Sequence, residues 1–151
     1  MCRYASEKKM SKDFESFLRA KIGGTYYKEL PGLFGIPDYV CFEKKDKCIN
    51  VVSFELKLTD WKTAIIQAFR YRSFSNKVYV VMPEDTVKRA VEHTDQFGQY
   101  GIGLASFTSG ELTILVDAGA YEPYSQHLRE KVDNRVRRSR KKPVGALSAI
   151  V

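Results

Sequence analysis

The sequence predicts a single α/β domain in which helices flank a central mixed β-sheet. Three observations predict it: a helical repeat of apolar residues near the start, three closely spaced strand-like segments, and an alternation of helices and strands afterwards. The chain has 151 residues, enough for one substantial hydrophobic core. It has no run of 18 or more apolar residues, so we expect no membrane span.

The first part of the chain is predicted to hold a helix and three antiparallel strands. Apolar residues recur at helical spacing from Met10 to Ile22, which predicts an amphipathic helix over residues 7–22, capped by Ser6 and ended by Gly23-Gly24. Strand-like segments follow over residues 25–30, 38–42 and 48–58. A loop rich in glycine and proline separates the first two, and a polar turn joins the last two into a hairpin.

In the second part of the chain, predicted helices alternate with predicted strands. A helix is predicted over residues 61–73, with Thr59 or Asp60 as its cap. The continuous apolar run from Val78 to Met82 is typical of a strand that is covered on both faces. The remaining elements are a surface helix over residues 84–95, strands over 102–107 and 112–116, and a helix from Pro123 to about Lys142. The core order is therefore α-β-β-β-α-β-α-β.

Positive charge is concentrated near the C-terminus. The net charge is +7, and residues 129–142 hold eight Lys or Arg against two acids, which leaves about +1 for residues 1–128. We therefore expect one domain over residues 1–128 and a basic helix or tail over 129–151 that is not a separate domain. A polyanion is the natural partner of such a tail. A solvated, partly disordered terminus explains the charge equally well.

The cysteines and the N-terminus favour a reducing compartment. Cys2, Cys41 and Cys48 are an odd number and suggest no disulfide framework. The N-terminal residues lack the apolar run of a secretory signal. We therefore expect a cytoplasmic protein.

Two charged side chains, Glu55 and Lys57, lie on the strand predicted over residues 48–58. They share one face of it, whereas the opposite face is entirely apolar. Burying charges is costly unless they pair with each other or bind a metal ion. This placement therefore suggests a functional site.

Other polar side chains are expected to converge on this pair. Asp38 opens the preceding strand, and Gln67 and Tyr71 share one face of the following helix. Glu15 flanks the apolar stripe of the first helix. Two carboxylates from adjacent strands offer the oxygen ligands that Mg²⁺ prefers. Lys57 can orient or deprotonate an attacking water, or stabilise charge that develops on phosphorus.

Each of these residues also has an ordinary structural explanation. The two strand charges fit the solvated face of an edge strand, and Asp38 fits a turn. The two helix side chains fit buried polar groups with neighbouring partners. A glutamate at a helix border, such as Glu15, is common, so a structural and a functional explanation are equally good for this residue. If this group of residues has no function, all of these structural explanations must be correct at the same time.

Three motifs in this order resemble the PD-(D/E)XK nuclease superfamily, which has the restriction-endonuclease-like fold. They are Gly35-Ile36-Pro37-Asp38, Glu55-Leu56-Lys57 and Gln67-Ala68-Phe69-Arg70-Tyr71. The last is similar to the Gln-apolar-x-x-Tyr motif of the exonuclease-type branch. With the order of elements included, the resemblance spans about residues 11–107.

The resemblance implies the residues of a metal centre. Asp38 and Glu55 would bind Mg²⁺ together with the backbone carbonyl of Leu56, and Mn²⁺ would substitute for Mg²⁺. Lys57 would be the catalytic lysine.

The resemblance also implies supporting residues. Gln67 and Tyr71 would position the lysine, the water or the scissile phosphate, and Glu15 would serve a second metal or an outer shell. Part of the branch carries an iron–sulfur cluster, but three cysteines do not supply its four ligands, so we expect no such cluster here.

The expected function is Mg²⁺-dependent hydrolysis of phosphodiester bonds in DNA, with RNA left open. Because no target-recognition domain is visible, we expect cleavage directed by structure or by strand ends. The alternatives are a non-catalytic nucleic-acid-binding module of the same fold, and an endonuclease like the Holliday-junction resolvases, which would need a homodimer. The expected phosphate contacts are Arg70, Arg72, Arg135, Arg137, Arg138, Arg140, Lys141 and Lys142.

Overall fold

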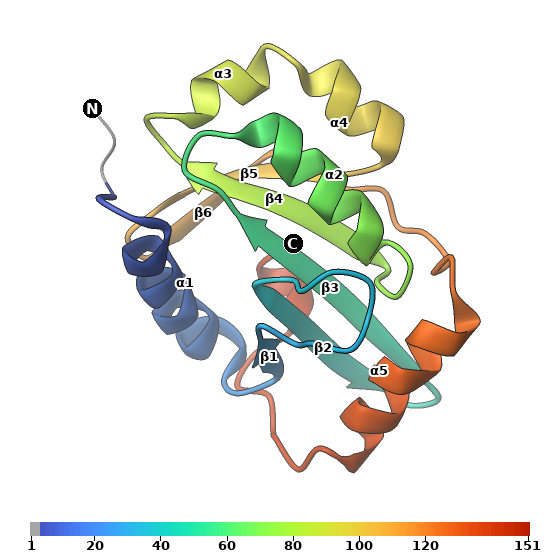
Figure 1. Cartoon of the computed structure of the whole chain (residues 1–151). Helices are drawn as coiled ribbons and strands as arrows, with labels where there is room; N and C mark the ends of the chain where they lie inside the picture. Colours follow the sequence, from blue (N-terminus) through green and yellow to red (C-terminus); the bar gives the residue numbers. More distant parts are fainter. Residues whose placement is uncertain (1–3) are drawn as a thin grey trace.

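A six-stranded mixed sheet runs through the middle of the computed structural model, which describes residues 4–151 (Figure 1). The strands lie in the order β1-β2-β3-β4-β5-β6. Neighbours are antiparallel except for the parallel pairs β3–β4 and β4–β5. The strand bounds are Tyr26–Lys28, Tyr39–Lys45, Cys48–Leu56, Lys77–Pro83, Gly103–Thr108 and Glu111–Val116. The predicted α/β class and mixed sheet are confirmed.

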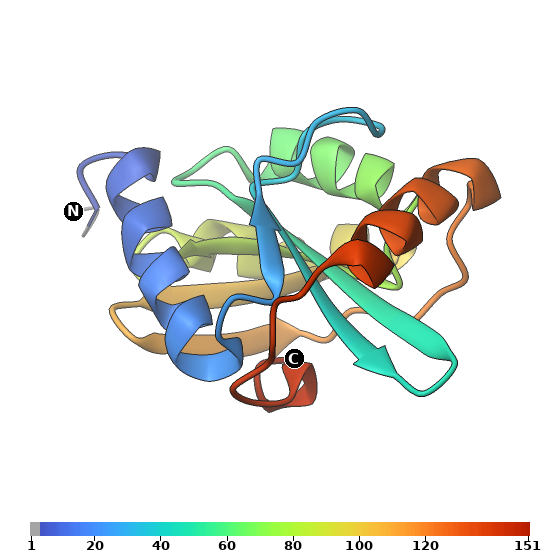
Figure 2. The same cartoon turned by 90° about the horizontal axis from the view of Figure 1, so that it is seen from below.

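Helices cover both faces of this sheet (Figure 2). α1 (Glu7–Ile22) and the short 3-10 helix η1 (Leu147–Ala149) pack on one face. α2 (Trp61–Tyr71), α3 (Val87–Val91), α4 (Thr94–Tyr100) and α5 (Gln126–Arg138) pack on the other. No helix among residues 4–151 has the length and apolar character needed to span a membrane.

The alternation predicted for β3 is confirmed by the two cores. Val52, Phe54 and Leu56 pack toward α1, whereas Val51 packs toward α2. Phe54 meets the ring of Phe14 edge-on, with 5.3 Å between the ring centroids. The face that carries Glu55 is therefore the one that α2 covers.

The predicted caps of the first two helices are confirmed. The Ser6 hydroxyl accepts a hydrogen bond from the Lys9 amide at 3.2 Å, and Asp60 accepts one from the Thr63 amide at 3.1 Å. The single helix expected over residues 84–95 is wrong: α3 and α4 are separated at His93. The His93 backbone leaves helical geometry there, and its ring stacks on Trp61 with centroids 4.4 Å apart.

The C-terminal segment packs onto the rest of the fold. α5 ends at Arg138 rather than near Lys142, because the backbone of Ser139 is extended. The chain then packs against the end of α1, where the Val144 amide donates to the Ile22 carbonyl at 3.2 Å. Buried side chains in α5, in η1 and after it complete both cores; they are Val132, Val136, Leu147 and Ile150.

Candidate functional site

Asp38, just before β2, lies between Glu29, just after β1, and Glu55, near the end of β3. The antiparallel register pairs Tyr39 with Phe54, which sets Asp38 across from Glu55. On the other side of Asp38, the Glu29 amide donates to the Asp38 carbonyl at 3.0 Å. The strand pairing therefore brings together two carboxylates from adjacent strands that the sequence placed 17 positions apart.

Glu55 lies on a central strand and not on a sheet edge. β3 has β2 and β4 as neighbours, and Glu55 is only 5% exposed. The explanation as a solvated edge-strand face is therefore wrong for this residue. Lys57 follows the end of β3 and is half-buried, and its amide donates to the Val81 carbonyl at 3.0 Å. Burial raises the pKa of both Asp38 and Glu55, and the positive charge of Lys57 offsets part of that rise.

The two carboxylates resist ionisation together. Burial and the neighbouring charge of Asp38 raise the pKa of Glu55 to about 8. Burial raises the pKa of Asp38 to about 6, although the Leu56 amide donates to its Oδ2 at 2.7 Å and favours the charged form. The charge of Glu7, at the start of α1, adds repulsion to both. A bound cation would relieve this repulsion.

Tyr71 ties the glutamate to the loop that precedes Asp38. Its hydroxyl lies 2.7 Å from Oε1 of Glu55 and 3.1 Å from the Ile36 carbonyl. A phenol has one proton, so it donates to one acceptor at a time. When Glu55 is ionised, the shorter contact is the favoured one; when Glu55 is protonated, the carboxyl can donate to the phenol and free the phenol proton for Ile36. Tyr71 is therefore a positioning residue.

The glycine of the first motif has a steric role at this contact. Gly35 has φ +76°, and a Cβ there would lie 3.0 Å from Cε1 of Tyr71. Any other residue would be strained and would push against the ring. Gly35 thus lets the loop approach Tyr71 closely enough to place Asp38.

Gln67 carries a buried acceptor without a partner. It lies one turn before Tyr71 on the same face of α2, and its Oε1 has no hydrogen bond to any residue within 4–151. An unsatisfied buried acceptor costs about 1–3 kcal/mol, so such atoms call for an explanation. A water or a substrate group that donates to Gln67 would supply one.

The donor set fits Mg²⁺ better than a metal that needs a complete protein cage. Within residues 4–151, no three His, Cys, Asp or Glu side chains gather closely enough to hold a metal ion. Mg²⁺ commonly takes one or two carboxylates and completes its shell with water and substrate phosphate. Asp38, Glu55 and the Leu56 carbonyl match that requirement.

Binding of Mg²⁺ by Asp38 and Glu55 would stabilise the fold in a pH-dependent way. At about pH 8, where Asp38 is ionised and Glu55 gives up its proton readily, saturating Mg²⁺ should add about 2–3 kcal/mol to the free energy of unfolding. Near pH 5.5 protons compete for both carboxylates, so the gain should largely disappear. Thermal melting with and without Mg²⁺ at both pH values measures this. An Asp38→Asn variant should show no gain; an equal gain in that variant would place the metal elsewhere.

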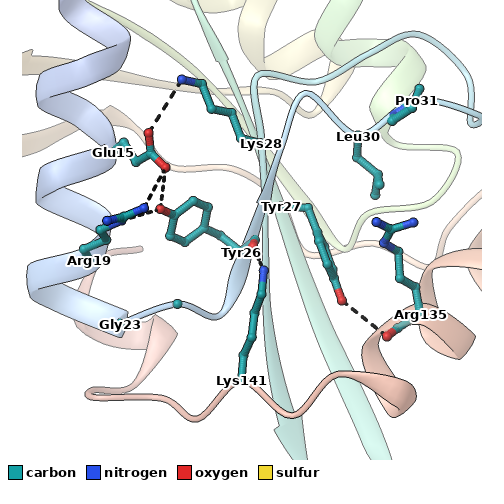
Figure 3. Close-up of a pocket in the computed structure, with 11 residues that line it drawn as sticks. Glu15, Arg19, Gly23, Tyr26, Tyr27, Lys28, Leu30, Pro31, Arg135 and Lys141 are labelled. Atoms are coloured by element: carbon teal, nitrogen blue, oxygen red, sulfur yellow. Dashed lines mark hydrogen bonds and ion pairs between the residues drawn. The ribbon is translucent and has the colours of Figure 1, made fainter.

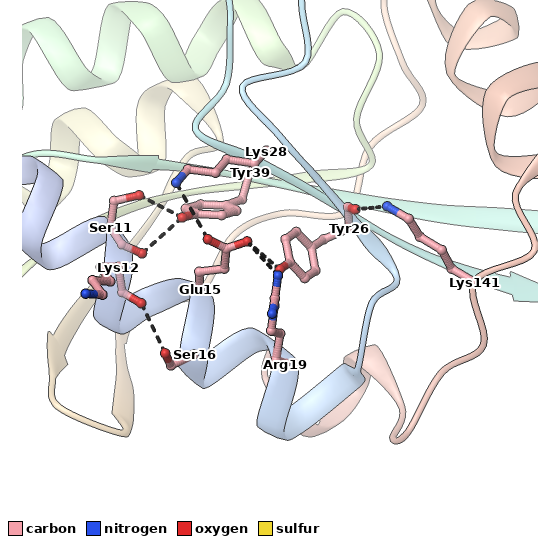
Figure 4. Close-up of polar contacts among 9 residues, drawn as sticks. All are labelled: Ser11, Lys12, Glu15, Ser16, Arg19, Tyr26, Lys28, Tyr39 and Lys141. Atoms are coloured by element: carbon pink, nitrogen blue, oxygen red, sulfur yellow. Dashed lines mark hydrogen bonds and ion pairs between the residues drawn. The ribbon is translucent and has the colours of Figure 1, made fainter.

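Glu15 is engaged by side chains of α1 and β1 (Figure 4), and its assignment to a second metal or an outer shell stays a prediction. It accepts a hydrogen bond from the Tyr26 hydroxyl at 2.6 Å, and its other contacts are ion pairs with Arg19 at 3.5 Å and Lys28 at 3.6 Å. The hydrogen bond from Tyr26 is the main reason why its pKa is lowered. Glu7, two turns earlier on α1, is the helix acid whose charge reaches Asp38 and Glu55.

Sequence reasoning missed Glu7 and Glu29 as neighbours of Asp38. Glu7, Lys28 and Glu29 line a cleft of about 380 Å³ together with Asp38. Glu29 has φ 51°, a left-handed conformation that is uncommon outside glycine and that often marks functional sites. A glutamate gives no sequence signal for such a backbone, so this position could not be found from the residues alone.

The two arginines of α2 have different surroundings. Arg70 is exposed at the rim of an apolar cleft, with its guanidinium 5.6 Å from the ring centroid of Phe34. Arg72 is stacked 3.7 Å from the ring centroid of Tyr121, and it donates to the Tyr100 carbonyl at 2.8 Å. Arg70 remains available to a phosphate. Arg72 is held by this ring and this carbonyl, and the expected phosphate contact there stays a prediction.

The C-terminal cations fall into two groups. Arg135 and Lys141 lie over the ring of Tyr27, at 5.0 and 4.5 Å from its centroid, and Lys141 also donates to the Tyr26 carbonyl at 2.8 Å. All six residues are exposed, and the other four lie at or beyond the end of α5; they are Arg137, Arg138, Arg140 and Lys142. Both groups are within the region where the sequence placed phosphate contacts.

Comparison with known proteins supports the fold and goes no further. No protein-family model matches the chain, and no curated protein sequence matches it. Among solved structures, the chain is similar to the SPO1766 protein of unknown function from Silicibacter pomeroyi, with a TM-score of 0.60 and 12% identity. The match covers 89% of this chain and 86% of that protein. At this identity the similarity shows a shared fold alone.

Proposed function

We propose that this protein is a Mg²⁺-dependent nuclease of the restriction-endonuclease-like fold that hydrolyses phosphodiester bonds in DNA in the cytoplasm. One observation carries the proposal: the β2–β3 register sets Asp38 across from Glu55, with Lys57 two residues further and Tyr71 hydrogen-bonded to Glu55. Further support comes from the raised pKa values of both carboxylates, which indicate a site that favours a bound cation.

The chain's own groups can divide the work of hydrolysis. Asp38, Glu55 and the Leu56 carbonyl would hold Mg²⁺, which when bound neutralises phosphate charge and acidifies a water. Lys57 would orient or deprotonate the attacking water, or stabilise the charge that develops on phosphorus. Tyr71 would keep Glu55 in place through its hydroxyl, and the orphaned Oε1 of Gln67 would accept a hydrogen bond from the water.

Lys57→Ala should lower Mg²⁺-dependent cleavage of DNA by about 10²–10⁴-fold while the fold persists, because the lysine is half-buried and makes no side-chain hydrogen bond within residues 4–151 that would hold the sheet together. The measurement is cleavage of single-stranded, duplex, flapped and four-way-junction DNA with Mg²⁺ or Mn²⁺. Lys88→Ala on α3 removes the same charge elsewhere and should cleave normally. Equal rates for Lys57→Ala and the wild type would remove the lysine from the mechanism.

The same panel separates the alternatives. A non-catalytic binding module would bind these substrates and cleave none of them with either metal. A junction-resolving endonuclease would cut four-way junctions as a dimer, so sedimentation showing only monomer on that substrate would exclude it.

A further inference from the structure

A cleft of about 660 Å³ lies along β1, between α1 and the segment over residues 139–142 (Figure 3). Tyr26 and Tyr27 line its floor. Four cations line it and only one acid, Glu15; the cations are Arg19, Lys28, Arg135 and Lys141. The excess of positive charge makes an anionic ligand the natural occupant.

This cleft adjoins the hollow that contains Asp38. Lys28 lines both the cleft and the hollow of about 380 Å³ that contains Asp38. In the other direction, Arg135 and Lys141 also line a shallow hollow of about 570 Å³ that includes Arg138. These shared residues make the three hollows neighbours, and we call the three together the β1 groove.

The cations at the two ends of the β1 groove differ in their partners. Arg19 and Lys28 are both ion-paired with Glu15. Within residues 4–151, Arg135 and Lys141 form no ion pair, and they lie close enough together for the charge of Arg135 to add to the effect of burial in lowering the pKa of Lys141. Two neighbouring cations without a carboxylate are stabilised by a bound phosphate.

The composition of the groove favours a single strand. Its floor is the edge strand β1 with Tyr26 and Tyr27, and exposed cations surround that floor (Figure 3). Proteins that bind single strands commonly combine a basic groove with aromatic side chains.

We propose that the β1 groove binds the sugar–phosphate backbone of single-stranded DNA that leads away from the Asp38–Glu55 centre, with Arg135 and Lys141 holding a phosphate. That the bound strand leads to a catalytic centre at Asp38 rests on the proposed function. That the strand binds in the groove does not. The function therefore gains a substrate class, a single strand or a single-stranded end.

The test is binding of a labelled single strand of about 12 nucleotides, measured by fluorescence anisotropy with EDTA present so that no cleavage occurs. The double variant Arg135→Gln/Lys141→Gln should bind at least about tenfold more weakly, and the slope of log affinity against log salt should become shallower by about 1.4, since each phosphate contact on a single strand contributes about 0.7. The matched control Lys88→Gln/Arg89→Gln removes the same charge from α3 and should bind like the wild type.

Two further measurements make the outcome decisive. The charge-retaining variant Arg135→Lys/Lys141→Arg should keep most of the affinity, and the wild type should prefer the single strand to a duplex of the same length. If the double Gln variant melts at a lower temperature, the exposed Arg135→Gln alone should still weaken binding about threefold, as expected for one cation of the pair. Wild-type affinity in the Gln variants, or equal binding of the duplex, would overturn the proposal.

The outcome is independent of the nuclease proposal. Weakened binding in the Gln variants of a protein that cleaves no DNA would support the groove and count against the nuclease. Unchanged binding in a protein that does cleave would do the opposite.

Discussion

Glu55→Gln should abolish Mg²⁺-dependent cleavage, with a loss of at least about 10³-fold, and should leave a protein that folds. An amide is a neutral and weaker metal ligand, so the several kcal/mol of transition-state stabilisation that the metal provides would be lost. The shape is retained because glutamine is isosteric, and its amide can still hydrogen-bond the Tyr71 hydroxyl. The loss should appear with every DNA substrate that the wild type cleaves.

The same variant should be more stable than the wild type when metal is absent. The folded pKa of Glu55, about 8, is higher than its ordinary value near 4.5, so the folded state holds the proton more tightly. The stability that protonated Glu55 contributes to the metal-free protein is therefore fully present below about pH 4.5 and is lost as the pH rises toward and through 8. Glu55→Gln removes this loss.

We expect the Glu55→Gln variant to exceed the wild type by about 1–3 kcal/mol at about pH 8 and to match it near pH 4, since a tenfold change in proton affinity is worth about 1.4 kcal/mol. Urea unfolding in EDTA at a series of pH values measures both curves. Glu111→Gln, an exposed change at the start of β6, is the matched control and should follow the wild type. Parallel curves for Glu55→Gln and the wild type would mean that Glu55 is not held protonated.

Arg129→Met should destabilise the fold by about 3–5 kcal/mol, because it leaves a partly buried carboxylate without its partner. Arg129 is 9% exposed, and its Nε donates to Asp133 at 2.8 Å. Its guanidinium also donates to Asn76 at 2.9 Å, and it contacts the carbonyls of Phe74 and Ile49. Arg129 therefore connects α5 to the N-terminal ends of β3 and β4.

Urea unfolding at constant pH tests this expectation. Lys131→Met, an exposed change on the same helix, should alter the free energy of unfolding by less than about 0.5 kcal/mol. A change below about 1 kcal/mol for Arg129→Met would show that α5 is held mainly by Val132 and Val136. Because α5 and the segment after it complete both cores, removing residues 129–151 would damage the fold, so point variants are needed to examine binding.

Local sequence pattern was sufficient for the centre of the site. Asp38, Glu55 and Lys57 could be placed because period-two alternation fixes the face of a strand, and a hairpin fixes which residues lie opposite one another. Tyr71 followed from helical spacing. The alternation of Val, Phe and Leu residues in β3 predicted the two cores in the same way.

The rest depends on packing between distant segments, which no local pattern reports. Glu15 and Glu7 lie on the same helix, and only the docking of α1 against β1 decides which of them comes near Asp38. Arg129 and Arg72 look like surface cations in the sequence, yet one is buried and the other is stacked between aromatic rings. The β1 groove likewise requires the return of residues 139–142 to β1.

The most direct test of the central claim is the initial rate of DNA cleavage with Mg²⁺, measured side by side for the wild type, the wild type with EDTA, and Glu55→Gln with Mg²⁺. We predict cleavage, with single-stranded or end-containing substrates preferred, only in the first of these three reactions. Cleavage by Glu55→Gln at the wild-type rate would contradict the account, as would wild-type cleavage that persists in EDTA.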